Sequence, residues 1–453
     1  MPTIAIDNFG GIAPRMHPTL LGETMATRAH NCLLKSGKLV PIHQPKKVLD
    51  MPLRLEGGLA DITDAKTIYV WRRSDGTAEI LAWPGIVFVT ESNLSHDKYS
   101  RIFVSGDTGV NDNRPMVYIY NGETDKSVVR HDLVKDPMDA PEADVSGGPS
   151  DEADIRYTAF VQTWVDQYGY ESGASNPSNE VEYSNGDAVT VSYAVAPAGA
   201  VKRRLYKLIA GTESEAYQFV DEQNAIGGAF QAVSVRVRDE DAGEVLPVLQ
   251  GPAEDLEMIV RVPNGFYAGV RRSDLREVRF SEGGNPTIWP DAYSASVHDD
   301  IVGLGVTLNT VFVLTKGKPW AVTGTAPDAM TAAILASPQG CVSAQSICTV
   351  DGRVFYASAD GICMLTDGTA TVSVLTDKLF SRRDWQALKP ETCRMLAHDQ
   401  TLFCWFADEN STSLAIHLTD DTTASVTTHD ERAVAVCVDV EADKMLFVRR
   451  IEQ

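Results

Sequence analysis

A turn signal followed by three apolar residues recurs at a nearly constant interval through the C-terminal half of the chain. The trios begin at residues 266, 311, 354, 402 and 445, so they are spaced by 45, 43, 48 and 43 residues. The turn signals before them are Asn264-Gly265, Asn309, Asp351-Gly352, Asp399-Gln400 and Asp443. A period in the forties that contains short strand-like runs and no long helical pattern is typical of β-propellers, in which each blade is a four-stranded sheet. The sequence therefore predicts an all-β fold.

The same pattern occurs near the N-terminus, in apolar runs that end at turn residues. The runs and their turns are Ile68–Trp71 with Ser74–Gly76, Arg101–Val104 with Ser105–Asp107, and Val117–Tyr120 with Asn121-Gly122. Two further blades fit here. The pattern then stops after Asn121 and resumes after Gly251. We therefore predict a propeller of about six blades whose chain is interrupted by an insertion.

The interrupting segment has its own character. Residues 132–154 hold eight acids and one Lys, together with Pro and Gly, which is a linker composition. Short strand-like runs separated by turns follow over about a hundred residues. They are Tyr157–Val165, Ala188–Tyr193, Arg204–Ile209, Tyr217–Val220 and Ala232–Val237. An inserted β-sandwich is the simplest interpretation of this pattern.

The first part of the chain differs from the rest in charge. Residues 1–60 hold seven Lys+Arg and four Asp+Glu, a net charge of +3, so the remainder carries −25. Leu21, Met25, Ala29 and Cys32 fall at helical spacing, which indicates a short amphipathic helix. We expect this arm to complement the charge of its own body or that of a neighbouring chain. The predicted domains are an N-terminal arm at 1–55, a first propeller part at 56–131, the inserted sandwich at 132–250 and a second propeller part at 251–453.

The overall charge restricts the partners. The chain has 62 Asp+Glu against 40 Lys+Arg, a net charge of −22, which argues against wrapping nucleic acid and against docking on anionic membranes. The start of the chain lacks the basic flank and apolar run of a secretory signal. The uncharged run Ala329–Val350 contains too many polar residues for a membrane span. Seven Cys without a CxxC pair indicate reduced thiols.

Catalytic motifs are absent from the sequence. The nine His residues form no HExxH and no metal-ligand spacing, and GxSxG, Walker A and GxGxxG signatures are missing. We therefore expect no enzyme activity, no catalytic, metal-binding or cofactor-binding residue, and no cofactor. The run Ser281–Trp289 resembles the SxDxGxxW turn of sialidase-type propellers, but Gly283 stands where that motif has Asp. We interpret it as a structural loop whose Trp289 packs between blades.

Clustered charges are the other candidates for chemistry. Asp239, Glu240 and Asp241, and likewise Asp299 and Asp300, could act as acid–base pairs only if they were buried and close together, and we expect them to be solvated. The basic clusters lack interleaved aromatic residues, so we interpret them as interface or surface charges rather than as a nucleic-acid groove. They are Arg271-Arg272, Arg382-Arg383 and Lys202-Arg203-Arg204.

Several longer runs resemble structural proteins of tailed bacteriophages. Those near the start are Asn8-Phe9-Gly10-Gly11, Pro14-Arg15, Ala26, Ala29-His30-Asn31-Cys32 and Ser36-Gly37-Lys38-Leu39-Val40-Pro41. Those resembling the propeller half are Arg279–Glu282, Trp289–Tyr293, Ile301–Gly305, Leu314–Pro319, Tyr356–Gly361 and Leu379–Trp385. The insertion is similar to fibronectin type III repeats at Tyr157–Val165, Glu171-Ser172, Asn176–Glu180 and Leu205-Tyr206. The resemblance covers most of the chain and contains no catalytic signature.

The resemblance implies a virion protein of the tail, made in the host bacterial cytoplasm: a nozzle or tail-tube component of a short-tailed phage. Such proteins form a ring, here expected to contain six chains, that contacts adaptor or portal-proximal tail proteins and tail fibres. The ring touches phage DNA only transiently and without sequence specificity, and it has no membrane anchor. The resemblance does not distinguish among three positions in the tail: nozzle, adaptor-proximal ring or minor tail protein. Acidic residues that line the channel would repel passing DNA. In the alternative interpretation, the acidic residues only make the protein surface soluble. The rival function is a glycan-binding or glycan-hydrolysing propeller, which would need Arg, Tyr and acids clustered over the blade axis.

Overall fold

The structure is a computed structural model. It describes residues 8–35, 38–48, 50–121, 127–132, 139–192, 196, 199–210, 215–225, 230–236, 238–246, 255–284, 286, 288–368, 371–407, 412–418 and 424–449. The turn Ser36-Gly37, Gly122, residues 133–138 of the predicted linker, and Tyr193 and Val237 of the predicted strands lie outside these residues. Internal contacts divide the chain into two compact units. The first unit comprises 1–130, 255–278 and 295–453, and the second comprises 131–254 and 279–294.

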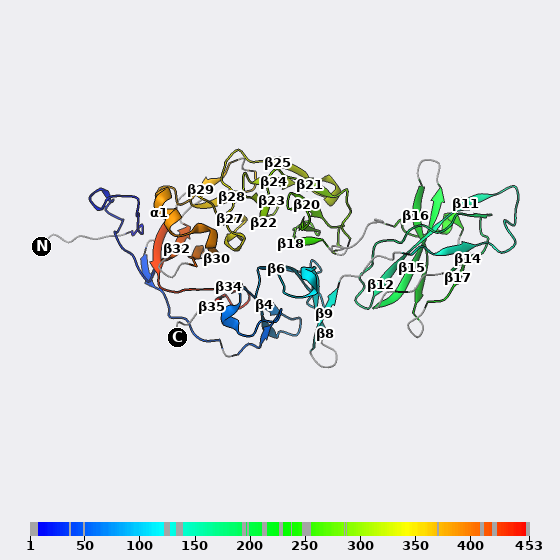
Figure 1. The fold of residues 1–453 in the computed structure, drawn as a ribbon, viewed down its shortest axis with the longest axis horizontal. Helices are drawn as coiled ribbons and strands as arrows, with labels where there is room; N and C mark the ends of the chain where they lie inside the picture. The colour runs from blue at the N-terminus through cyan, green and yellow to red at the C-terminus, as the bar shows by residue number, and fades with distance from the viewer. Residues whose placement is uncertain are drawn as a thin grey trace. The chain divides into compact units, whose positions relative to one another are not determined.

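Seven small sheets, numbered here in chain order, account for most strands outside residues 139–246 (Figure 1). The first three are β3 (Leu53–Leu55), β5 (Ala78–Trp83) and β4 (Thr67–Arg72) in sheet 1; β6 (Val87–Glu91), β7 (Ile102–Gly106), β8 (Met116–Asn121) and β9 (Ser127–Asp132) in sheet 2; and β18 (Leu256–Arg261), β19 (Tyr267–Arg271), β20 (Glu277–Phe280) and β21 (Ser294–Ser296) in sheet 3.

The other four sheets follow along the chain. Sheet 4 has β22 (Ile301–Val306), β23 (Thr310–Thr315), β24 (Trp320–Thr323) and β25 (Thr331–Ile334), and sheet 5 has β26 (Cys348–Val350), β27 (Arg353–Ala357), β28 (Ile362–Thr366) and β29 (Ser373–Val374). Sheet 6 has β30 (Arg394–His398), β31 (Thr401–Trp405), β32 (Ser413–Leu418) and β33 (Ala424–His429), and sheet 7 has β34 (Ala435–Asp439) and β35 (Lys444–Val448). The fold is therefore all-β, as the sequence predicts.

Helices are few among the described residues. One short α-helix, α1 (Arg382–Ala387), begins at Ser381, whose hydroxyl accepts a hydrogen bond from the amide of Asp384. The 3₁₀ turns are η1 (Pro18–Leu20), η2 (Ile62–Asp64), η3 (Asn111–Asn113), η4 (Asp239–Asp241), η5 (Pro327–Ala329), η6 (Ala344–Ser346) and η7 (Pro390–Thr392). In the part of the chain that the structure describes, no helix is long and apolar enough to cross a membrane.

Each of the five C-terminal trios overlaps the second strand of its sheet: β19, β23, β27, β31 or β35. The turn residues explain why the chain reverses just before these strands. Asp351 and Gly352 have φ values of 50° and 70°, and Asp399 and Gln400 have 47° and 55°. Positive φ at both central residues of a two-residue hairpin loop matches the twist of the flanking strands. The turn signal and the trio are thus two parts of one hairpin.

Neighbouring sheets pack through apolar side chains. The rings of Trp71 in sheet 1 and Tyr118 in sheet 2 meet edge to face with centroids 6.1 Å apart. The Ile259 amide of sheet 3 donates a hydrogen bond of 3.0 Å to the Ser105 hydroxyl of sheet 2, and β18 contacts β22 of sheet 4. Apolar clusters join the remaining neighbouring sheets. Their members include Phe312, Leu314, Val354 and Tyr356 between sheets 4 and 5; Phe355, Met364, Leu402 and Cys404 between sheets 5 and 6; and Phe403, Trp405, Val436 and Phe447 between sheets 6 and 7.

The last sheet also packs against the first. Cys437 and Leu446 of sheet 7 share an apolar cluster with Ile68, Val70 and Ala82 of sheet 1. Every residue of this cluster core is buried. The contacts between sheets therefore return to their starting point after the seventh sheet.

Residues 8–35, which the structure describes, form no α-helix, so the predicted helix over Leu21–Cys32 is wrong. The segment is mostly extended, and it runs beside β33: the Ile12 amide donates to the Val426 carbonyl at 2.9 Å, and the Asn31 amide donates to the Thr428 carbonyl at 2.7 Å. These strand-edge hydrogen bonds fix an extended backbone and override the helical spacing of the apolar residues. The hairpin of β1 (Cys32–Lys35) and β2 (Lys38–Pro41) follows.

This packing explains why the N-terminal run contains two glycines. A Cβ on Gly11, which has a φ of 85°, would lie 2.5 Å from the Val426 carbonyl oxygen, and a Cβ on Gly10 would lie 2.7 Å from the Met25 sulfur. Ile12 and Ala29 are buried in the cluster that joins sheets 5 and 6. The described residues of the arm thus contact their own chain.

The second unit consists of three small sheets. Their strands are β10 (Glu142–Asp144), β14 (Val189–Ser192) and β17 (Val233–Val235); β11 (Arg156–Thr158) and β13 (Val181–Tyr183); and β12 (Phe160–Asp166), β15 (Ala200–Ala210) and β16 (Glu215–Asn224). Phe160 and Leu205 pack with Val189 and Val191 from the sheet opposite. The core of this unit therefore lies between facing sheets.

Candidate functional site

A cavity of about 340 Å³ lies in the first unit. Each of the seven numbered sheets contributes residues to its wall, from one edge strand or from positions directly beside that strand. These edge strands are β4, β6, β18, β22, β26, β30 and β34. We call it the axial cavity. Aliphatic side chains dominate its wall, and examples are Val87, Ile259, Leu304, Ile347, Leu396 and Val436. The edges of seven successive sheets thus line one cavity, which is open to solvent on one side of Lys66.

The polar side chains of the axial cavity are few. They belong to Lys66, Thr67, Gln345 and Arg394. The amide nitrogen of Gln345 donates to the Lys66 carbonyl at 2.8 Å. Burial raises the pKa of the Cys348 thiol, which also lines the cavity, to about 12, so this thiol is neutral at physiological pH. No carboxylate is among the described lining residues, so the cavity offers no acid–base pair.

A second pocket of about 540 Å³ has a polar wall. Its charged groups are mutually paired: Arg15 bonds to Asp377, and Asp360 contacts both Arg382 and the side-chain amide of Gln339. These pairs are exposed to solvent, where each contributes at most about 1 kcal/mol. Their visible role is to attach the N-terminal segment and α1 to the loops of sheet 5.

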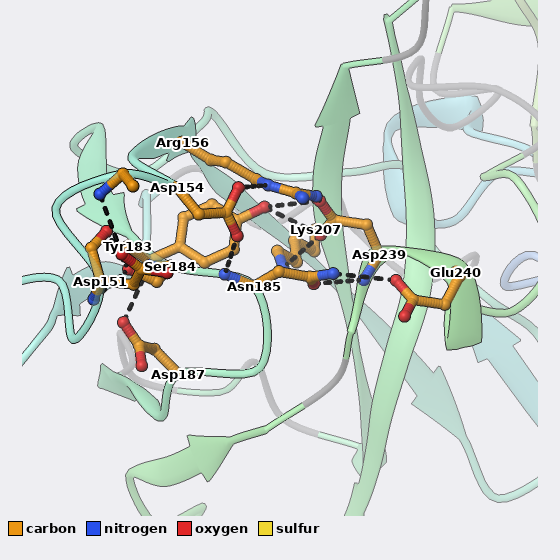
Figure 2. A network of polar contacts seen from close by, with 11 residues as sticks. Asp151, Asp154, Arg156, Tyr183, Ser184, Asn185, Asp187, Lys207, Asp239 and Glu240 are labelled. Carbon is orange, nitrogen blue, oxygen red and sulfur yellow. Dashed lines mark hydrogen bonds and ion pairs between the residues drawn. The ribbon is translucent and has the colours of Figure 1, made fainter.

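The densest polar network lies in the second unit and is centred on Asp239 (Figure 2). Its Oδ1 accepts a hydrogen bond from Lys207 Nζ at 2.7 Å, and its Oδ2 accepts one from Arg156 Nη1 at 2.7 Å. The Tyr183 hydroxyl lies 2.8 Å and 3.0 Å from the two oxygens. Burial raises the pKa of Asp239, but the hydrogen bonds from Lys207, Tyr183 and Arg156 outweigh burial and hold that pKa below its ordinary value.

The network extends from Asp239 to neighbouring loops. Arg156 Nε donates to Asp154 at 2.8 Å, and the Asn185 side chain links the Asp239 amide to Glu240. The Lys207 side chain is only 3% exposed, and burial lowers the pKa of its amine. Each of these side chains thus bonds to another residue of the network. Within the described ranges, no group of His, Cys, Asp and Glu could hold a metal ion. The network therefore connects β11, β13, β15 and η4.

Two interpretations of the charged residues are wrong. Asp239 is not solvated, because it is the ion-pair partner of buried Lys207. Arg203 is not a surface charge: its side chain is fully buried, with Asp221 at 3.8 Å. Its neighbours Lys202 and Arg204 do lie partly exposed and pair with Glu222. The alternation of a strand places consecutive residues on opposite faces, so a run of three basic residues cannot share one environment.

The other sequence candidates are dispersed. Asp300 pairs with Arg276 and Lys316 at the surface, and Arg271 pairs with Asp255 and Glu277. The remaining basic pairs also have structural or surface positions: Arg272 donates to the carbonyls of Asp112 and Asn113, and Arg382 and Arg383 are exposed on α1.

The sialidase-like turn closes on itself. The Glu282 amide donates to the Ile288 carbonyl at 2.9 Å, and Trp289 Nε1 donates to the Pro286 carbonyl at 2.8 Å. Trp289 is buried. Asn285 and Thr287 of this run lie outside the described residues.

The sequence did not single out Lys66 or Arg394, the two cations of the axial cavity. Lys66 and Arg394 are 328 positions apart in the chain, and neither belongs to a motif. Their shared cavity is produced by the return of sheet 7 to sheet 1. Only the pairing of distant sheets brings them together.

Comparisons with known proteins give no family. No family model and no curated protein matches the chain. Among solved structures, apo AztD from Citrobacter koseri matches with 10% identity and a TM-score of 0.29 over 80% of this chain and 94% of that one. A chain of a mitotic checkpoint complex matches with 9% identity and a TM-score of 0.31 over 90% and 100%, and Kluyvelomyces marxianus Hsv2 matches with 8% identity and 0.25 over 51% and 58%. This chain thus spans little more than half of Hsv2, and scores this low carry no argument about function.

Proposed function

We propose that this chain is a virion structural protein: a ring-forming nozzle or tail-tube component of a short-tailed bacteriophage that forms part of the conduit for DNA ejection. The proposal rests on the runs that resemble tail proteins of such phages, on the all-β architecture and on the arrangement of the seven sheets. Within it, the first unit is a β-propeller and the second is an inserted sandwich similar to fibronectin type III repeats.

The arrangement of sheets supports a propeller of seven blades rather than about six. Each sheet packs against its successor, and the last packs against the first. One edge strand from each sheet contributes to the same cavity, as the inner strands of radially arranged blades do. The five trios and the two blades predicted near the N-terminus also number seven. A propeller protects its own strand edges, so a ring of chains would associate through loops and the inserted unit.

The single observation that favours a structural role over glycan hydrolysis is the composition of the axial cavity. A glycosidase needs two carboxylates flanking its substrate, and a glycan-binding axis would combine Arg and Tyr with acids. The described lining of this cavity contains Arg394 but no Tyr, Asp or Glu. In the polar networks elsewhere, the charged groups bond to one another, as expected for groups that stabilise the fold.

The charge distribution supports a conduit that does not retain DNA. Residues 131–254 contain 22 Asp+Glu and eight Lys+Arg, so they carry −14 of the net −22. A ring of such chains would repel a duplex at low salt, where electrostatic repulsion is least screened. Because the inserted unit carries most of the charge, we propose that it, more than the propeller, keeps DNA away from the wall.

The decisive experiment is to determine the oligomeric state of the purified chain by native mass spectrometry and electron microscopy. We expect a closed ring of six chains that retains no duplex DNA in a low-salt binding assay. A chain that stays monomeric at every concentration, or a ring that binds DNA at low salt, would contradict the conduit. Glycan cleavage that disappears in Glu282→Gln would instead favour the rival function.

A further inference from the structure

We infer that the axial cavity is a binding site for a small molecule that joins a carboxylate to an apolar body, with Arg394 as the group that recognises the carboxylate. The inference goes beyond the proposed function and does not depend on it, because it follows from the cavity of the first unit alone. It gives a binding role to Arg394, a cation for which the described residues provide no ion-pair partner.

Arg394 is a partly buried cation that has no counter-charge among the described residues. Its Nε is fully shielded from solvent and has no hydrogen-bond partner among the described residues, and its guanidinium forms no ion pair with them. Partial burial lowers the pKa of Arg394, in agreement with the shielding of its Nε from solvent. Removing a charge from water costs several kcal/mol unless a counter-charge and hydrogen bonds replace the water.

Other cations of this chain show what a satisfied site contains. Arg101, which is buried, has Asp97 Oδ2 at 2.7 Å from its Nε. Lys207 has Asp239 Oδ1 at 2.7 Å. The scaffold thus supplies a carboxylate at about hydrogen-bond distance to these buried cations. At Arg394 the corresponding position is the axial cavity itself, whose described wall contains no acid.

The chemistry of the wall selects the class of ligand. A planar guanidinium pairs with a carboxylate through two parallel hydrogen bonds, which gives both affinity and orientation. Lys66, which is exposed, adds a second positive charge. The Thr67 hydroxyl already bonds to backbone atoms of Gly85 and Val87, and the Gln345 amide nitrogen donates to the Lys66 carbonyl, so the two cations are the groups that can recognise the carboxylate. The remaining side chains, such as Ile259 and Leu304, are aliphatic and match an apolar body. A volume of about 340 Å³ falls within the range of small-molecule sites.

The test uses octanoate as the anionic probe and octanol as its neutral counterpart, with binding to the full chain measured by isothermal titration calorimetry. We expect octanoate to bind wild type and octanol to bind at least tenfold more weakly. In Arg394→Met, which keeps the length of the side chain, octanoate affinity should fall at least tenfold. Arg394→Lys should retain part of it. Arg383→Met is the control, because Arg383 is exposed on α1 and outside the cavity.

A second readout separates recognition from folding. Without ligand, Arg394→Met should melt at or above the wild-type temperature, since it removes an uncompensated charge. With saturating octanoate, only wild type and Arg383→Met should gain thermal stability. If Arg394→Met fails to fold, Lys66→Met and Arg394→Lys provide the affinity comparison. The inference is overturned if octanoate does not bind wild type, or if octanoate and octanol bind equally and Arg394→Met changes neither.

Discussion

Arg72 and Asp439 form a two-pronged ion pair that joins sheet 1 to sheet 7. Nε of Arg72 lies 2.7 Å from Oδ1 of Asp439, and Nη2 lies 2.6 Å from Oδ2. The carboxylate is 1% exposed, and the hydrogen bond from Arg72 is the main reason why the pKa of Asp439 lies below its ordinary value. The pair thereby links strands of two different sheets across 367 positions of the chain.

Arg72→Met should destabilise the first unit by about 3 kcal/mol, because it leaves the Asp439 carboxylate buried without its partner. Urea unfolding followed by circular dichroism would measure the change. The matched control is Arg276→Met, which breaks a solvent-exposed pair with Asp300 and should cost less than about 1 kcal/mol. Equal effects of the two substitutions would show that the Arg72–Asp439 pair stabilises the protein no more than an exposed ion pair does.

Acid should loosen the second unit through the Asp239 network. Hydrogen bonds hold the pKa of Asp154, Asp187 and Asp239 below the ordinary value of 3.8. A carboxylate with a depressed folded-state pKa contributes stability that is complete above its unfolded-state pKa and is lost as the pH falls through the folded-state value. Protection of residues 142–192 from hydrogen exchange should therefore be constant above about pH 5 and fall between about pH 4 and pH 2.

Asp239→Asn provides the test of that mechanism. It removes the partner of buried Lys207 and should lower stability by about 3 kcal/mol at neutral pH, with a weaker dependence on acid. Asp241→Asn is the control, since Asp241 is exposed in the same 3₁₀ turn. An unchanged acid profile in Asp239→Asn would assign the acid sensitivity to other carboxylates.

The hairpin before β31 should be stabilised by glycine. Gln400 has a φ of 55°, a conformation that costs a residue with a Cβ about 1 kcal/mol. Gln400→Gly should therefore raise the free energy of unfolding by about 0.5–1 kcal/mol, whereas Gly352→Ala at the equivalent turn should lower it by a similar amount. No atom lies within 4 Å of a Cβ built on Gly352, so its cost is conformational rather than steric. Denaturant midpoints that move in the same direction for both variants would refute this account.

Deleting residues 1–45 should destabilise the first unit by several kcal/mol, because buried Ile12 and Ala29 and the neighbouring Phe9 and Met25 pack on the cluster between sheets 5 and 6. It should also leave the edge of β33 unpaired. Thermal melts of the deletion and of a control lacking only residues 1–7 would separate this packing from any effect of chain length. A wild-type melting temperature in the longer deletion would mean that the segment contributes only to association.

The hairpins could be predicted from sequence because their signals are local. A pair such as Asp351-Gly352 tolerates positive φ, and the apolar trio that follows fills a strand buried on both faces. The N-terminal segment could not be predicted in this way. Its apolar spacing favours a helix, whereas its backbone is fixed by hydrogen bonds to Val426 and Thr428, about 400 residues away.

The environment of single charges was equally inaccessible to sequence. Lys202, Arg203 and Arg204 look alike in the chain, yet only Arg203 is fully buried. Arg394 shows the opposite case: an ordinary residue becomes a candidate site only because residues of seven sheets line a cavity around it. Burial of a charge depends on which distant segments meet there, and a linear pattern does not contain that information.

The packing of sheet 7 on sheet 1 has a consequence for biosynthesis. Translation releases Ile68 and Val70 roughly 370 residues before Cys437 and Leu446, which cover them, a delay of about 20–70 s at an elongation rate of about 5–20 residues per second. During that time the apolar face of sheet 1 has no final partner on the ribosome, while the second unit has already emerged complete. Nascent chains that terminate before residue 435 would keep this face exposed, which makes them natural clients of chaperones and proteases.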